Sequence, residues 1–202
     1  FDTTSIYALI HYLEREWGVF FCMGGTGKLI KELEALMVRQ GISIRYNTDV
    51  EQILLEKGRT SGVLTTSGDI ISSDRVICNA DTPAVYDELL SAQPKRRKKA
   101  IPDKLTRYSM GLYVLFFGTR KKYDSIAHHT IWMGKRYRSL LADIFNSKIL
   151  ADDFSLYLHR PTATDQSFAP DDCDSFYVLC PVPNLQGNVN WDVQGPALQE
   201  RI

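Results

Sequence analysis

The spacing of apolar residues changes at Gly41, and this change restricts the chain to folds that combine helices with strands. Before Gly41, apolar side chains recur at helical intervals, which predicts helices over residues 5–16 and 28–40. After it, short runs alternate apolar and polar side chains between turn residues, as in half-buried strands. The strands predicted in this part are residues 42–46, 50–55, 62–66, 70–71 and 75–78.

The rest of the sequence predicts more elements of both kinds. Residues 81–90 return to helical spacing, with Pro83 in the first turn, where its missing N–H is harmless. The later predicted elements are a strand over 108–117, a helix near 137–145, strands near 154–159 and 175–181, and a helix that starts after Gly195-Pro196 and runs over 197–202. Separate helices and aromatic-rich strands indicate an α+β arrangement, a sheet covered by helices, with its remaining strands outside this chain.

The ends of the chain and its cysteines suggest where it comes from. Because it starts at Phe1 and stops within a predicted helix, we expect it to be an internal piece of a longer protein. The longest apolar run, residues 111–118, is far below the roughly 20 residues of a membrane-spanning helix. The cysteines stand singly in apolar surroundings, so we expect reduced core thiols and a protein that faces the cytosol. They are Cys22, Cys78, Cys173 and Cys180.

Charge is concentrated in the middle of a chain whose formal net charge is zero. Residues 95–138 hold 13 basic side chains against two acidic ones, a net charge of +11. Anionic lipid attracts such clusters by about 1 kcal/mol per basic side chain near the surface. A solvated charged face is the plain alternative, and no nucleic-acid motif accompanies the charge. The densest part of this basic stretch is Lys95, Arg96, Arg97, Lys98 and Lys99.

The segment Gly24-Gly25-Thr26-Gly27-Lys28 resembles a phosphate-binding loop without matching one. A P-loop needs glycine where Cys22 stands and Ser or Thr where Leu29 stands, and Ile30 occupies the third glycine position of the dinucleotide pattern. The segment therefore predicts a tight turn that leads into a helix.

Two polar motifs raise the question of a bound metal. His128-His129 lacks further ligands nearby, because His11 and His159 are far away in sequence, so no metal site is predicted. Residues 171–174, Asp-Asp-Cys-Asp, lack the glycine and the later glutamate of a calcium loop and are interpreted as a solvated acidic turn.

Taken together, several long segments are similar to bacterial phytoene desaturases, and the similarity covers essentially the whole chain. They are residues 7–21 (YALIHYLEREWGVFF) followed by Gly24–Gly27, residues 127–130 (AHHT), residues 153–159 (DFSLYLH) and residues 177–183 (YVLCPVP). The resemblance implies an α/β fold of the FAD-binding, amine-oxidase-like kind, in which one domain holds FAD and another encloses a lipophilic channel. It also implies that the N-terminal strand–GxGxxG–helix unit, which grips the FAD pyrophosphate, lies outside this chain.

On this resemblance the chain divides into three parts. Residues 1–41 are the helical part of the substrate domain, residues 42–92 contribute strands to the FAD-binding domain, and residues 93–202 form a substrate- or membrane-facing domain that is incomplete at its C-terminus. The FAD contacts implied are Val50, which matches a strand that passes the adenine, and Asn79 and Ala80.

The implied reaction is the FAD-dependent desaturation of phytoene, in which the flavin does the difficult chemistry. The hypothetical channel residues are Tyr7, Trp17 and Phe20, which are equally suited to a core; no catalytic group is assigned. We expect the whole enzyme to attach to the cytoplasmic side of a membrane, helped by Lys95–Lys99, and this chain alone to be inactive. The alternatives are a sister carotenoid desaturase or saturase, and a membrane-surface module without cofactor.

Overall fold

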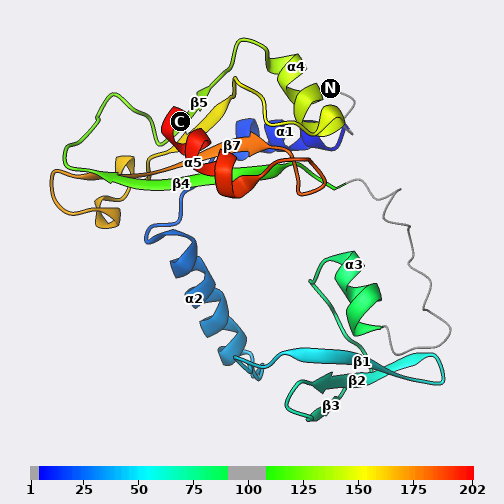
Figure 1. Ribbon diagram of the computed structural model, residues 1–202. Coiled ribbons are helices and arrows are strands. Elements are labelled where there is room, and N and C mark those ends of the chain that lie inside the picture. The colour runs from blue at the N-terminus through cyan, green and yellow to red at the C-terminus, as the bar shows by residue number, and fades with distance from the viewer. Residues whose placement is uncertain (1–4, 91–107) are drawn as a thin grey trace. The chain divides into compact units, whose positions relative to one another are not determined.

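A computed structural model describes residues 5–90 and 108–202 (Figure 1). The chain divides into two compact units, one formed by residues 1–36 with 108–202 and the other by residues 37–107. The basic residues Lys95–Lys99 lie outside the described residues. In the described part of the chain no helix is both long and apolar enough to cross a bilayer.

The unit of residues 37–107 contains a small antiparallel sheet in the order β1-β2-β3. Its strands are β1 (Val50–Glu56), β2 (Arg59–Thr65) and β3 (Ile70–Ser72). Lys57 and Gly58 join β1 to β2 with φ values of 50° and 80°, the two positive angles of the turn that suits a twisted hairpin. A helix follows the sheet, as α3 (Thr82–Ala84) and a π-helical continuation η1 (Val85–Leu89).

The other unit is built on a four-stranded antiparallel sheet in the order β4-β7-β6-β5 (Figure 1). The strands are β4 (Gly111–Thr119), β5 (His129–Trp132), β6 (Leu156–His159) and β7 (Asp174–Val182). The long central strand β7 alternates buried and half-buried residues along its whole length, because its two faces have different surroundings.

One face of this sheet carries the core. Cys180 and Val182 of β7 pack with Leu198 of helix α5 (Trp191–Arg201), and Leu198 is only 1% exposed. Tyr113 and Trp191 extend this cluster. Leu140 and Ile144 are buried in α4 (Tyr137–Ala142) and its π-helical continuation η3 (Asp143–Ser147).

The opposite face of the sheet is largely open. Register places Phe116 beside Tyr177 on this face, and His159 beside His129. Its apolar side chains remain exposed, namely Leu112, Val114, Phe116 and Ile131. A sheet face this apolar is usually covered or used for binding.

The first two helices also expose their apolar side chains. Helix α1 (Tyr7–Trp17) has no buried residue, and in α2 (Gly25–Arg39) only Gly25 is buried. Both helices were predicted from periodicity, and both are confirmed, with α2 starting at Gly25 inside the predicted turn.

The predictions for two strands, the start of the last helix and two of the cysteines are wrong in the described structure. Residues 42–46 and 75–78 are not strands, and no described strand pairs with them; Ile77 is fully exposed. The last helix begins at Trp191 and contains Pro196 instead of starting after it. Cys22 and Cys78 are exposed and so are not core thiols, whereas Cys180 is buried, which raises the pKa of its thiol to about 11.

Candidate functional site

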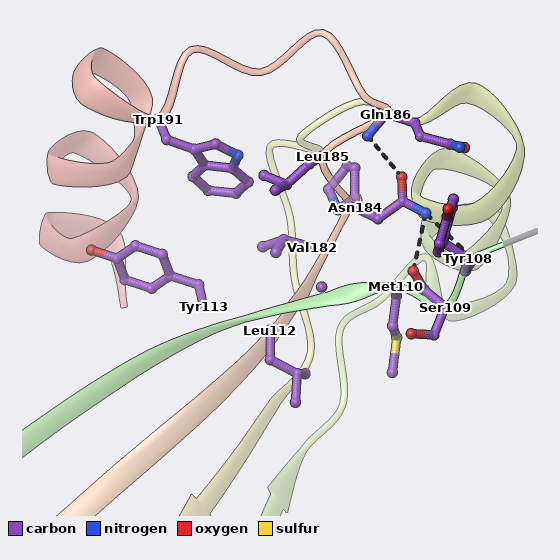
Figure 2. Close-up of a pocket in the computed structure, with 12 residues that line it drawn as sticks. Tyr108, Ser109, Met110, Leu112, Tyr113, Val182, Asn184, Leu185, Gln186 and Trp191 are labelled. Atoms are coloured by element: carbon purple, nitrogen blue, oxygen red, sulfur yellow. Dashed lines mark hydrogen bonds between the residues drawn. The ribbon is translucent and has the colours of Figure 1, made fainter. Parts of the chain in front are cut away.

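A cavity of about 690 Å³ opens where β4 begins and β7 ends (Figure 2). Figure 2 shows Tyr113, Val182 and Leu185 around the indole of Trp191, which comes from the first turn of α5. The rings of Tyr113 and Trp191 are stacked, with centroids 6.3 Å apart. The remaining walls are Tyr108, Ser109, Met110, Gly111, Leu112, Pro183, Asn184 and Gln186.

Hydrogen bonds of Asn184 connect the segment before β4 with the segment after β7 at the rim of this cavity (Figure 2). Its Nδ2 donates hydrogen bonds to the carbonyl oxygens of Tyr108 and Ser109 at 3.3 and 3.0 Å, and its Oδ1 accepts one from the N–H of Gln186 at 3.1 Å. Among the residues that the structure describes, the walls carry no acid, lysine, arginine or histidine. A cavity of this composition suits an apolar ligand that offers no charged group.

A cluster of histidines and aromatic rings lies on the open face of the same sheet. The β5–β6 register sets His129 directly opposite His159, and His128 Nε2 lies 3.0 Å from His159 Nε2. The ring of Tyr177 on β7 lies 4.5 Å from that of His159, and Phe21 lies 4.6 Å from His128. We call His128, His129 and His159 the histidine cluster.

Burial favours the neutral form of His159 and His128. Burial, and after it the repulsion from positive charge on His128 and His129, lowers the pKa of His159 to about 4. Burial, then the neighbouring His129, also lowers the pKa of His128. Burial and the nearby Tyr177 raise the pKa of Tyr157, whose hydroxyl lies 2.6 Å from His129 Nδ1, to about 12.

A second hollow of about 480 Å³ adjoins the histidine cluster. Phe21, His159 and Tyr177 line it together with Gly25 and Phe168. The N–H of Gly24 donates to Asp165 Oδ2 at 2.7 Å, which ties the glycine turn to the loop that carries Phe168. The predicted turn into a helix is thus confirmed, and its neighbours are aromatic.

A buried ion pair stands next to the histidine cluster. Arg160 Nε donates to Asp174 Oδ2 at 2.9 Å, and Thr162 Oγ1 and the N–H of Tyr123 donate to the same carboxylate at 2.6 and 2.7 Å. Burial by itself raises the pKa of Asp174, but these hydrogen bonds outweigh it and hold the pKa below its usual value. The solvated acidic turn predicted at 171–174 is therefore wrong for Asp174, which is 1% exposed.

The three predicted FAD contacts lie in the unit of residues 37–107. Val50 begins β1 and lines a shallow hollow of about 380 Å³ with Ser43, Arg45, Thr48 and Ile71. Asn79 and Ala80 lie in the exposed irregular segment before α3. Arg45 and Thr48 bring to this hollow a guanidinium and a hydroxyl, groups that suit part of a nucleotide, and the role of Val50, Asn79 and Ala80 stays a prediction.

The predicted channel residues line neither the cavity beside Trp191 nor the hollow beside the histidine cluster. Tyr7, Trp17 and Phe20 are 61%, 68% and 87% exposed, and their role stays a prediction. Sequence reasoning missed Trp191 and Tyr113, because the continuous apolar run of residues 111–117 does not reveal which side chains face the core.

The histidine cluster was also missed, for a specific reason. The sequence argument set His159 aside because it is far from His128 in the chain, and this argument is wrong, since antiparallel pairing of β5 and β6 brings them together. The histidine cluster could have been predicted only by assuming that the AHHT segment pairs with the strand that ends at His159.

Comparison with known proteins finds a matching family model and several similar desaturases. A model of flavin-containing amine oxidoreductases matches residues 2–157. All of this chain is 47% identical to a lycopene-forming phytoene desaturase of Pseudescherichia vulneris and 44% identical to one of Pantoea ananas, and it covers 41% of each relative. It is 35% identical to a zeta-carotene-forming phytoene desaturase of Myxococcus xanthus, of which it covers 38%. The chain thus spans about two fifths of the length of these curated relatives.

Proposed function

Because the chain belongs to the flavin-containing amine oxidoreductase family, we propose that it is the central part of an FAD-dependent desaturase that acts on phytoene. The observation that carries this proposal is the similarity of the entire chain to phytoene desaturases, at up to 47% identity. The apolar cavity beside Trp191 adds independent support, because a hydrocarbon substrate needs a binding site without charge.

The cofactor would supply the redox chemistry, by accepting a hydride from the saturated bond. The residues of this chain that would hold part of it are Val50, with Arg45 and Thr48 in the same hollow, and the backbone around Asn79 and Ala80. The chain's own contribution to the substrate is alignment and exclusion of water. Tyr113, Leu112 and Trp191 provide apolar contacts along the cavity, so selectivity depends on its length and shape.

The named products of the relatives differ, being lycopene, neurosporene or zeta-carotene. The desaturation steps therefore have to be counted directly. The test is to supply phytoene and FAD to the full-length polypeptide that carries this sequence and to separate the products by chromatography with absorbance detection. Formation of a longer conjugated polyene supports the proposal, and unchanged phytoene with a protein that retains flavin refutes it.

A pair of variants tests the cavity itself. Leu185 lines it and is 89% exposed, so Leu185→Trp fills space without removing a core contact. Val193 is 66% exposed in α5 and does not line it, so Val193→Trp is the matched control. We expect Leu185→Trp to lower turnover or shorten the product series, with Val193→Trp unchanged. Equal products from both variants would exclude this cavity from the substrate path.

We also propose that the whole enzyme attaches to the surface of a membrane, because its substrate dissolves in lipid and Lys95–Lys99 favour anionic headgroups. Flotation with anionic liposomes tests this proposal. Replacing the five basic residues by acidic ones should reduce the floating fraction, and an unchanged fraction would count against their role.

A further inference from the structure

We propose that His128, His129 and His159 bind one transition-metal ion, such as Zn²⁺ or Co²⁺. One ring nitrogen of each histidine lies within 4.8 Å of the others. The pairing of β5 with β6 fixes two of the three rings opposite each other, and His128 is the residue just before β5. The site is therefore built on paired strands, which hold ligands more rigidly than loops do.

The distances are close to those of a metal site. In tetrahedral coordination with Zn–N bonds of about 2.0–2.1 Å, two nitrogen ligands are separated by about 3.3–3.4 Å. Nε2 of His128 and Nε2 of His159 are 3.0 Å apart. To hold an ion, these two nitrogens have to move apart by a few tenths of an ångström. The third ligand nitrogen, from the exposed His129, lies within 4.8 Å of both.

Hydroxyl groups already orient two of the rings. Thr164 Oγ1 is hydrogen-bonded to His128 Nδ1, and the hydroxyl of Tyr157 lies 2.6 Å from His129 Nδ1. Each of these contacts leaves the other ring nitrogen for a ligand, as is usual for metal-binding histidines. His159 is held instead by ring packing against Tyr177, with centroids 4.5 Å apart.

The donor set selects the class of ion. Within the residues that the structure describes, the cluster consists of three imidazoles without a carboxylate or thiolate. Imidazoles favour zinc, copper, nickel or cobalt, whereas magnesium and calcium need oxygen ligands. Three protein ligands leave a fourth coordination position for water or another small ligand. The proposal does not depend on the desaturase function, because no step of that function uses these histidines.

The competing explanation is that His128 and His159 simply share a hydrogen bond within an aromatic surface. Titration of Co²⁺ into the metal-free, full-length polypeptide distinguishes the two. A bound cobalt ion with nitrogen ligands gives a visible absorption band, and Zn²⁺ added afterwards should remove it at one equivalent.

Matched variants assign the band to this site. His129→Ala changes an exposed residue, His159→Gln keeps the shape of a half-buried one, and His11→Ala is the control, because His11 is the fourth histidine of the chain and lies exposed on α1. Far-ultraviolet circular dichroism checks that each variant is folded. We expect His129→Ala and His159→Gln to weaken Co²⁺ binding by more than about tenfold, Tyr157→Phe to weaken it by about tenfold, and His11→Ala to leave it unchanged.

Three results would overturn the proposal. The first is the absence of a cobalt band in the unaltered protein. The second is a band of equal affinity in His129→Ala, which decides the question even if His159→Gln fails to fold. The third is an equal loss in His11→Ala, which would indicate nonspecific binding.

Discussion

Arg160 Nε donates a hydrogen bond to Asp174 Oδ2 at 2.9 Å, and the two side chains are 6% and 0% exposed. Arg160 follows His159 directly and Asp174 begins β7, so the pair joins β6 to the start of its neighbour. Arg160 Nη1 also donates to the carbonyl oxygen of Ile126 at 2.9 Å. The pair therefore holds in place the segment that leads to His128 and His129.

Removing one charge of this pair should destabilise the protein strongly. Asp174→Asn leaves the buried guanidinium of Arg160 with only the exposed Asp124 as an ionic partner, which costs about 3–5 kcal/mol in the free energy of unfolding. Urea unfolding followed by circular dichroism measures the loss. Asp153→Asn is the control, because its ion pair with Arg136 is exposed to solvent and contributes little. Similar losses in both variants would contradict the structural role assigned to Asp174.

The lowered pKa of Asp174 predicts that the free energy of unfolding depends on pH. The folded-state pKa of Asp174 lies below the value of about 3.9 expected in the unfolded chain, so its stabilising contribution is complete above that value. The contribution is lost as pH falls through the folded-state pKa. We expect the difference in unfolding free energy between the unaltered protein and Asp174→Asn to shrink as pH is lowered from 6 to about 3. A constant difference over this range would show that the carboxylate is not stabilised by its partners.

Gly25 should tolerate no side chain. A Cβ at this position would lie 2.7 Å from Cζ of Phe168, and the residue has φ of 76°. Gly18 has nearly the same φ, 77°, but a Cβ there meets nothing within 4 Å. Both alanine variants carry the backbone strain, so Gly25→Ala should cost about 1–3 kcal/mol more than Gly18→Ala, from overpacking. Equal melting temperatures of the two variants would mean that Phe168 moves aside freely.

The core of the larger sheet depends on Leu198. This side chain is 1% exposed against Cys180 and Val182, so Leu198→Ala should cost about 2–5 kcal/mol. Leu185→Ala removes the same atoms from a residue that is 89% exposed, and it should change stability by less than about 0.5 kcal/mol. Thermal unfolding of the two variants checks this, and a small effect at Leu198 would argue against α5 as a cover of the sheet.

Much of the secondary structure was predictable from local patterns. Helices α1 and α2 and strands β1, β2, β4 and β7 follow from residue spacing, because a repeat of 3.6 or 2 is a property of the neighbouring residues alone. Strand β5 was missed, since its residues, His129–Trp132, place two polar side chains before two apolar ones and so show no alternation. Residues 42–46 alternate apolar and polar side chains and residues 76–78 form a short apolar run, yet a strand forms only where another strand offers its backbone groups.

The sequence by itself determined the family, the α+β mixture of elements and the glycine turn before α2, because each depends on a local pattern of residues. Only the tertiary structure decided which distant residues meet. It set Trp191 over Tyr113, Arg160 against Asp174 and His159 beside His128. The physical reason is that strand register and helix packing result from the burial of whole faces, so contacts between residues far apart in the chain are not encoded at either position alone.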